Sequence, residues 1–386
     1  MMVKDVEIAK LAAKPLINNA HTLVIGQTGS GKTTTVLAAI DELQATNQTN
    51  IILDPTGEYS TVPNAIVYKL AENSYFEASR LSANDFNQIF GLSENQRFIS
   101  KLAQAIAALR IQKNITQQGT IYPKINVAIK KYSRQLARLG HWAYDYDLKL
   151  LAQQIIEEYV VPFADERADY QVLGQVYDYA AIREDWSDII KLQELVNDPI
   201  IGAVFKFTAT NKPGQRKVKT AIDFVVQLFA KNQSHHRSLV IDLSALKALP
   251  VLQGQLVSLL MQGLLASRTK NQERFPMMVF LDEAHRYLPV VTDKIAENGL
   301  FQILREGRKY GINLTLTTQS PLDLPVKMVT QFANLLVHQI VSRDELSYLT
   351  TIQPEQAQTI TELPVGQAAV YQNNRFLEFI KIKAVK

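Results

Sequence analysis

The chain has 386 residues, of which 47% are hydrophobic and 20% are charged, close to the average of soluble globular proteins, so wholesale disorder is excluded. It contains no cysteine, which excludes disulfide bonds and thiolate metal sites. Its net charge of +4 is too small to indicate nucleic-acid binding by itself.

The N-terminal residues do not show the pattern of a secretory signal peptide. The opening stretch MMVKDVEIAKLAAKP lacks an apolar run followed by a small-residue cleavage site, so no signal peptide is expected. No stretch approaches the ~18 consecutive apolar residues of a membrane span. We therefore expect a cytoplasmic protein that does not contact a membrane.

The first strong element is the strand HTLVIG, which leads into GQTGSGKT (26–33) and a helix. This stretch fits the pattern G-x-x-x-x-G-K-[ST] between a strand and a helix. Glycines let backbone N–H groups surround phosphates, and the helix N-terminus adds positive partial charge. Lys32 is expected to reach the β- and γ-phosphates, and the Thr33 hydroxyl to bind Mg²⁺. The nucleotide-binding residues predicted in this loop are Gly26, Thr28, Gly29, Ser30, Gly31, Lys32, Thr33 and Thr34.

A second strand, Ile51 to Leu53, ends in the turn-like stretch DPTGEY. Asp54 and Glu58 would lie at the same sheet edge as the phosphate loop and help position water or a neighbouring subunit. Asp-Pro-Thr-Gly is equally a good turn with Asp as its hydrogen-bonding first residue. Both interpretations stay open, and the two acids are included among the nucleotide-binding candidates.

From about Tyr75 to Ser238 the apolar spacing is helical. It predicts a helical insertion domain (76–235) between two parts of a core (1–75 and 236–386). Between Asn95 and Tyr144 there are nine Lys or Arg and no acid, whereas residues 145–198 hold thirteen acids and four bases. The first block includes Arg97, Lys101, Lys130, Lys131, Arg134 and Arg138.

Three interpretations of these blocks are open. Lys130, Arg134 and Arg138 recur at i, i+4 and i+8, beside a stripe of apolar residues, which describes either a solvated helix face or a phosphate-facing surface. Alternatively, the basic and acidic blocks pair between subunits. The stretch TNKPGQRKVK, with Arg216, Lys217 and Lys219, is a second candidate for a phosphate-facing surface.

Strands then return near Val240, Val279, Leu314 and Val337, and two short ones follow as QAAVYQ and FLEFIKI. Helices lie between them, notably Val251 to Lys270 and Ala296 to Tyr310. This alternation predicts an α/β fold with a mainly parallel sheet covered by helices on both faces.

The strand MVFL is followed directly by Asp282 and Glu283. Asp282 would complete the Mg²⁺ shell, and Glu283 would orient and deprotonate the attacking water, because phosphoryl transfer depends on positioning and electrostatics. The alternative is that this acidic pair merely caps the next segment; the nearby phosphate loop favours the catalytic interpretation.

The stretch REGRKYGINLTLTTQSP joins a helix end to another strand. If that strand is central, Gln319 emerges beside Asp282 and Glu283 and senses the γ-phosphate or the attacking water. Arg308, always ionised, would stabilise the transferring phosphoryl group in the next subunit. The open alternative for Arg305, Arg308 and Lys309 is that they complement the helix C-terminus.

Together, HTLVIGQTGSGKTTT, LDPTGEY, FLDEAHRYLP and REGRKYGINLTLTTQSP resemble the HerA branch of the FtsK-HerA superfamily of ring-shaped DNA-pumping ATPases. The resemblance covers about residues 18–75 and 236–345. It implies a RecA-like P-loop NTPase core, ATP and Mg²⁺ as cofactors, hexamers with nucleotide between subunits, and double-stranded DNA in a central channel. It also implies that Arg308 is the trans-acting arginine and Gln319 the sensor.

HerA-like translocases usually carry an N-terminal β-barrel that helps dock a nuclease or other effector, and here only 25 residues precede Gly26. The resemblance therefore leaves the partner arrangement open. Our leading hypothesis is an ATP-driven DNA translocase or helicase. The alternative is a regulatory or scaffolding ATPase whose ring controls a partner effector. A transporter-type ATPase is disfavoured because the helical region holds no LSGGQ-like signature. Because no base-reading motif is evident, ATP rather than GTP rests on the resemblance.

Overall fold

The computed structural model describes Ile17 and residues 19–207, 219–234, 237–270, 275–288 and 298–382. The chain forms two compact units: unit 1 comprises the residues up to Lys69 together with Ile222–Lys386, and unit 2 comprises Leu70–Ala221. The sequence placed the second boundary at 235/236, whereas helix α9 (Ile222–Lys231) belongs to unit 1, where it packs on helix α10 (Pro250–Lys270). Arg216 and Lys217 lie outside the described residues.

Unit 1 is built on a nine-stranded sheet with the order β13-β12-β11-β1-β10-β9-β2-β8-β3. Its strands pair in parallel except at β11–β12 and β12–β13, which are antiparallel. The predicted α/β fold with a mainly parallel sheet is therefore confirmed; the edge strand β3 was not foreseen. The strands are β1 (Thr22–Ile25), β2 (Thr49–Asp54), β3 (Ala65–Lys69), β8 (Ser238–Asp242), β9 (Met277–Leu281), β10 (Ile312–Thr318), β11 (Asn334–Val337), β12 (Gln367–Gln372) and β13 (Arg375–Lys381).

Strand β10 lies between β1 and β9, and this order positions the candidate site. In the register, Thr318 lies opposite Ile25 of β1, and Leu316 lies opposite Leu281 of β9. All three strands run in parallel, so their carboxyl ends meet at one edge of the sheet, where ligands bind in open α/β folds. The phosphate loop, Asp282 and Gln319 each follow one of these ends.

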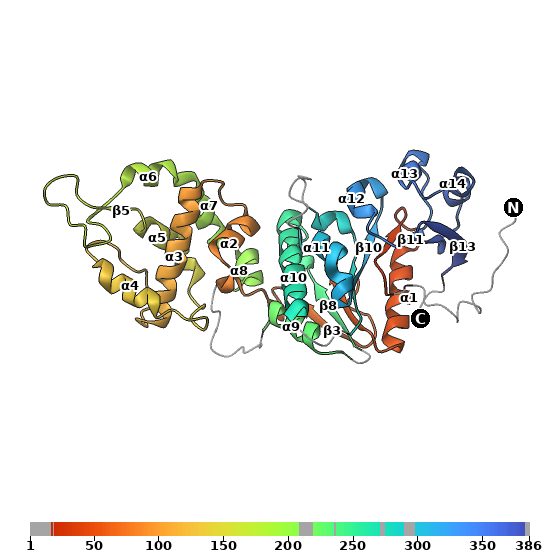
Figure 1. The fold of residues 1–386 in the computed structure, drawn as a ribbon, viewed down its shortest axis with the longest axis horizontal. Helices are drawn as coiled ribbons and strands as arrows, with labels where there is room; N and C mark the ends of the chain where they lie inside the picture. Colours follow the sequence, from red (N-terminus) through yellow and green to blue (C-terminus); the bar gives the residue numbers. More distant parts are fainter. Residues whose placement is uncertain are drawn as a thin grey trace. The chain divides into compact units, whose positions relative to one another are not determined.

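Helices cover both faces of this sheet, as a parallel sheet buried on both sides requires. Helix α1 (Lys32–Ala45) buries Val36, Ala39, Ile40 and Leu43 against one face, which includes Ile52, Met278 and Phe280. Helices α9 and α11 (Gly299–Glu306) each pack on α10 (Figure 1). The C-terminal part adds the short helices α12 (Val326–Val329), α13 (Arg343–Tyr348) and α14 (Pro354–Thr361).

Unit 2 is mainly helical, as the periodicity predicted. Its long helix α3 packs against α2 and α5, and buries Phe98, Leu102, Ala105 and Leu109. Its helices are α2 (Ala83–Phe90), α3 (Gln96–Asn114), α4 (Ile129–Ala137), α5 (Leu151–Glu157), α6 (Tyr179–Glu184), α7 (Trp186–Asn197) and α8 (Pro199–Val204). Two small sheets pair β4 (Ser74–Tyr75) with β7 (Thr220–Ala221) and β5 (Val160–Val161) with β6 (Val176–Tyr177). Within the described ranges, no helix has both the length and the hydropathy to cross a bilayer.

Candidate nucleotide site

The phosphate loop is a turn lined by backbone at the start of α1. Gly29 (φ 81°) and Gly31 (φ 109°) adopt the left-handed conformation that favours glycine. A Cβ on Gly26 would lie 2.5 Å from the Cβ of His338, so no side chain fits there. The loop thus presents its N–H groups at a helix N-terminus, which suits an anion.

Lys32 is nearly buried, and its ammonium turns back onto its own loop. Nζ donates to the carbonyl oxygens of Gly26 (2.7 Å) and Gln27 (3.1 Å). Burial lowers the pKa of Lys32, and the nearby charges of Glu283 and Asp282 only partly oppose this effect. Two neutral carbonyls do not compensate a buried cation, so a phosphate oxygen would be the stronger partner. The buried hydroxyl of Ser30, in the same loop, has no hydrogen-bond partner within the described structure and could donate to a phosphate as well.

Asp282 lies at the end of β9 and is 8% exposed. Its Oδ1 accepts hydrogen bonds from the Thr317 hydroxyl and from the backbone N–H of Glu283. Burial raises the pKa of Asp282, and the adjacent Glu283 charge adds to the shift. A cation would relieve both effects. Thr33, in the first turn of α1, and Asp282 carry oxygen atoms of the kind that Mg²⁺ takes as ligands; nucleotide phosphates and water would supply the other ligands.

Glu283 is held in an unusual backbone conformation, with a φ of 52°. Its N–H donates to the Thr317 hydroxyl (3.0 Å). Its Oε1 accepts from Nε2 of Gln319 (3.0 Å), whose Oε1 accepts from the hydroxyl of Thr28 (3.0 Å). A non-glycine residue in this region signals a functional constraint more often than chance. The structure thus connects phosphate loop, glutamine and glutamate in one hydrogen-bonded series.

Sequence reasoning missed two groups beside Glu283. His285 Nδ1 lies 3.3 Å from Glu283 Oε2 and 4.0 Å from Asp323 Oδ2. Asp323 in turn accepts from the Thr318 hydroxyl (2.9 Å). The histidine follows the acidic pair in the stretch DEAH, so its position was a usable signal. No sequence pattern pointed to Asp323, because only the turn after β10 brings it close to His285.

A third missed residue, His338, supports the phosphate loop from behind. It is fully buried after β11, and its Nε2 lies 2.8 Å from the hydroxyl of Thr35 in α1. Burial lowers its pKa to about 4, and the Lys32 charge acts in the same direction. Gly366 fixes the loop from the same side, because its N–H donates to the Ser30 carbonyl (2.9 Å). No local pattern could associate residues this distant in sequence.

Asp54 and Glu58 lie differently from the other candidates. Asp54 is fully buried, and its carboxylate accepts hydrogen bonds from four backbone N–H groups of its own loop, those of Thr56, Gly57, Glu58 and Tyr59. These hydrogen bonds are the ones expected if Asp54 is the first residue of a turn. Glu58 is exposed and lines a hollow beside α1 with Leu37 and Pro63. The residue of this stretch that lies near Asp282 is Tyr59, whose pKa is raised by burial and by the Asp282 charge.

Arg308 lies far from the phosphate loop of its own chain. It precedes β10, whereas Gln319 follows that seven-residue strand, a separation of roughly 20 Å. Its charge instead acts on His21, before the start of β1, and helps burial to lower the pKa of that histidine to about 4. Arg308, Arg305 and Lys309 are all exposed. The structure therefore does not bring Arg308 to the site formed by its own chain.

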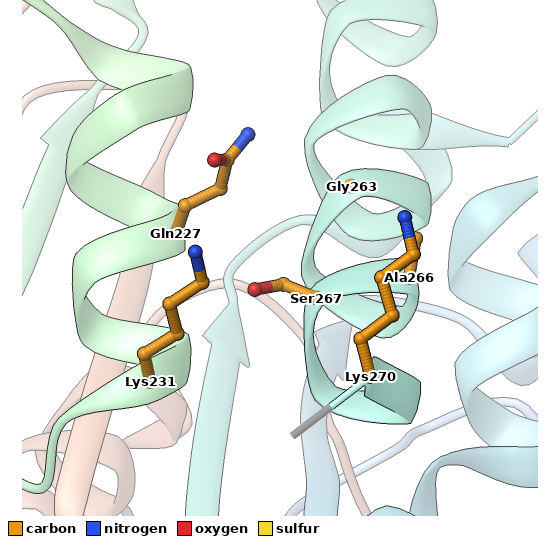
Figure 2. Close-up of a pocket in the computed structure, with 6 residues that line it drawn as sticks. All are labelled: Gln227, Lys231, Gly263, Ala266, Ser267 and Lys270. Carbon is orange, nitrogen blue, oxygen red and sulfur yellow. The ribbon is translucent and has the colours of Figure 1, made fainter.

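Two hollows in unit 1 differ in their relation to this site. One, of about 700 Å³, adjoins the carboxyl ends of the strands and is lined by Gln27, Thr28, His285, Gln319, Ser320, Asp323, Ile340, Val341, Ser342 and Glu345. The other, of about 510 Å³, lies between α9 and α10 and contains none of the predicted site residues (Figure 2). Its Lys231 and Lys270 end their helices, where cations complement the helix dipole, so helix termination accounts for them.

Comparison with known proteins identifies relatives. A family model described as "Helicase HerA, central domain" matches residues 3–262. The chain is similar to the DNA double-strand break repair helicase HerA of Sulfolobus acidocaldarius, with 26% identity over 96% of this chain and 65% of that protein. It is also similar to the probable HerA helicase of Methanocaldococcus jannaschii, with 23% identity over 91% of this chain and 68% of that protein. The chain thus spans about two thirds of the length of these relatives.

Solved structures share the fold at low identity. VirB4 of Thermoanaerobacter pseudethanolicus aligns with a TM-score of 0.59 and 12% identity, over 95% of this chain and 90% of that one. The plasmid coupling protein TrwB in complex with ADP and Mg²⁺ aligns with a TM-score of 0.55 and 13% identity, over 95% and 86%. These alignments confirm the predicted P-loop NTPase fold.

Proposed function

The chain belongs to the family of the HerA helicase central domain, and we propose that it is an Mg²⁺-dependent ATPase that works as a ring, a homohexamer, to translocate on or unwind double-stranded DNA. The observation that carries this proposal is the hydrogen-bonded series from Thr28 through Gln319 to Glu283, at the edge where Asp282 and Lys32 also lie. A nuclease or other effector as partner follows from the family resemblance alone.

The side chains divide the work of hydrolysis. When bound, Mg²⁺-ATP supplies the electrophilic phosphorus and its leaving group. With nucleotide bound, Lys32 would exchange its two carbonyl acceptors for phosphate oxygens, and Thr33 and Asp282 would hold the metal. Glu283 takes the proton of the attacking water, and Gln319, which contacts both Glu283 and Thr28, orients the carboxylate and that water. Arg308 serves the site of a neighbouring subunit.

The alternative is a regulatory ATPase whose ring controls an effector with little translocation. The charged blocks were one reason to consider it, because they would mediate contacts between proteins. Within unit 2, however, part of these blocks pairs internally: Arg97 binds Asp185 (2.7 Å), and Lys124 binds Glu158 (2.8 Å). That internal pairing weakens the support for the alternative.

The test is steady-state ATP hydrolysis by the wild type and by Glu283→Gln, with and without long linear duplex DNA, together with the mass of the protein in solution. A six-subunit species whose hydrolysis is stimulated by DNA, and abolished by the substitution, is expected. Hydrolysis that is slow and indifferent to DNA would instead favour the regulatory ATPase.

A further inference from the structure

Eight of the nine basic residues between Asn95 and Tyr144 fall into two groups in the structure, and the ninth, Lys113, is exposed in the last turn of α3. One group is bound inside unit 2: Arg97 pairs with Asp185 and Glu184, and Lys124 pairs with Glu158, where both side chains are 3% exposed. Lys101 donates to the Glu158 carbonyl, and Arg110 donates to the Ser79 carbonyl. These cations stabilise the fold of unit 2 and are not available to a partner.

The second group lies on helix α4 and at its C-cap, which is Arg138. Lys130, Lys131, Arg134 and Arg138, here called the α4 basic face, are all exposed, and in the described part of unit 2 no carboxylate lies within ion-pair distance of them. Figure 1 shows α4 beside α3.

Helix α4 is anchored by its other side. Tyr132 and Leu139 pack against the cluster of Ala108, Ile111 and Tyr122, and Lys124 lies 3.8 Å from the Tyr132 ring centroid. The helix start is fixed as well, because the Ile129 N–H donates to the Gln171 carbonyl (2.8 Å). Asp169, two residues before Gln171, accepts a hydrogen bond from the Gln171 N–H (2.8 Å). Although α4 buries none of its residues fully, these contacts place its opposite side against the cluster, so the α4 basic face is directed away from that cluster.

Four like charges on so short a helix repel one another, and an ordinary solvated face mixes both signs. An anionic partner removes that repulsion. Lys130, Arg134 and Arg138 follow one another at intervals of roughly 6 Å along the helix axis. Phosphates of one DNA strand advance about 3.4 Å per nucleotide, so each interval spans about two nucleotides. A regular polyanion matches this row better than a globular protein with scattered acids.

We propose that the α4 basic face binds the phosphate backbone of double-stranded DNA. The inference deepens the proposed function, on which it rests, by assigning a DNA-contacting surface to unit 2. Contacts of this kind give affinity without sequence preference, and each one contributes about 0.9 to the slope of log K against log salt concentration.

The test compares two full-length triple variants by fluorescence anisotropy with a labelled duplex over a salt series. One carries Lys130→Gln, Arg134→Gln and Arg138→Gln. Its matched control, Arg167→Gln, Arg183→Gln and Lys191→Gln, removes the same charge from the same unit, but Arg167 and Lys191 already pair with Asp165 and Asp188. Circular dichroism of both variants establishes that they are folded.

The α4 variant is expected to lose at least tenfold in affinity at ~0.1 M salt and to lower the salt slope by roughly 2 to 3, while the control keeps the wild-type slope. If the wild type binds duplex and both variants keep its slope, the surface assignment is wrong while the proposed function stands. If the wild type neither binds duplex nor hydrolyses ATP faster with DNA, the surface assignment and the proposed function are both wrong. Binding of polyglutamate, but not of DNA, through the same residues would assign the face to an acidic protein and overturn the proposal.

Discussion

The side-chain amide of Gln319 lies 3.0 Å from the carboxylate of Glu283, although 36 residues separate them in the chain. Gln319 also accepts a hydrogen bond from Thr28 in the phosphate loop. The residue that would sense the γ-phosphate, Gln319, is therefore hydrogen-bonded to the residue that would act as base, Glu283. This arrangement joins nucleotide binding to the orientation of the catalytic carboxylate.

Replacement of this glutamine should therefore affect turnover more than binding. Gln319→Ala is expected to lower kcat about 100- to 1000-fold, the usual loss when one positioned donor is removed, with nucleotide affinity within about threefold of wild type. Gln319→Glu, which keeps the length but puts a negative charge against Glu283, should be no more active. Hydrolysis rates together with the Kd of a fluorescent nucleotide check this, and weaker binding at unchanged kcat would contradict it.

Arg308 should act in another subunit, because it lies at the opposite edge of the sheet from its own phosphate loop. Lys32→Ala and Arg308→Ala should each be inactive alone. An equimolar mixture of the two should regain up to about a quarter of wild-type hydrolysis, since some interfaces then combine an intact loop with an intact arginine. Arg305→Ala provides the matched surface control and should keep wild-type activity. A mixture as inactive as its components would exclude a role in trans.

Asp54 should matter for folding. Its buried carboxylate satisfies four backbone N–H groups, so Asp54→Ala leaves these donors without an acceptor and should destabilise the protein by about 3–5 kcal/mol in urea unfolding. Glu58→Gln, at an exposed position, should change the unfolding free energy by less than about 0.5 kcal/mol. Equal stability of the two variants would refute the turn role of Asp54.

Two buried histidines should make stability depend on pH. Burial lowers the pKa values of His21 and His338 to about 4 in the folded protein, from 6.5 for a histidine in water. Well above pH 6.5 the two histidines are neutral in both the folded and the unfolded chain, and the free energy of unfolding is unaffected. As the pH falls from 6.5 towards 4, the histidines of the unfolded chain bind protons while those of the folded chain do not, so the free energy of unfolding decreases. At pH 5 the loss is about 2 kcal/mol for each histidine.

The variant His338→Gln should thus lose about 2 kcal/mol less than the wild type between pH 7 and pH 5, measured by urea unfolding at each pH. His141→Gln, at an exposed position, is the control and should follow the wild-type curve. A wild-type pH dependence in His338→Gln would show that this histidine is not held neutral by the fold.

The sequence by itself determined where the phosphate loop, the acidic pair Asp282–Glu283 and the central strands of the sheet lie. Glycine spacing, a lysine before a threonine and runs of apolar residues are local patterns, and they specify a turn, a helix start and a buried strand wherever they occur. The resemblance carried by these patterns was enough to name the family. The edge strand β3 and the helix α9 were less clear, because each lies beside the change from one periodicity to the other.

Only the tertiary structure decided which distant residues meet. The strand order inserts β10 between β1 and β9, and this brings Gln319 to Glu283 while it leaves Arg308 at the far edge. Packing buries His338 behind the phosphate loop and directs Asp54 into its own turn. It also binds Arg97 and Lys124 to acids inside unit 2 and leaves the α4 basic face exposed. The desolvation of a charged side chain, and its pairing with an opposite charge, depend on neighbours from remote parts of the chain. No local sequence pattern carries that information.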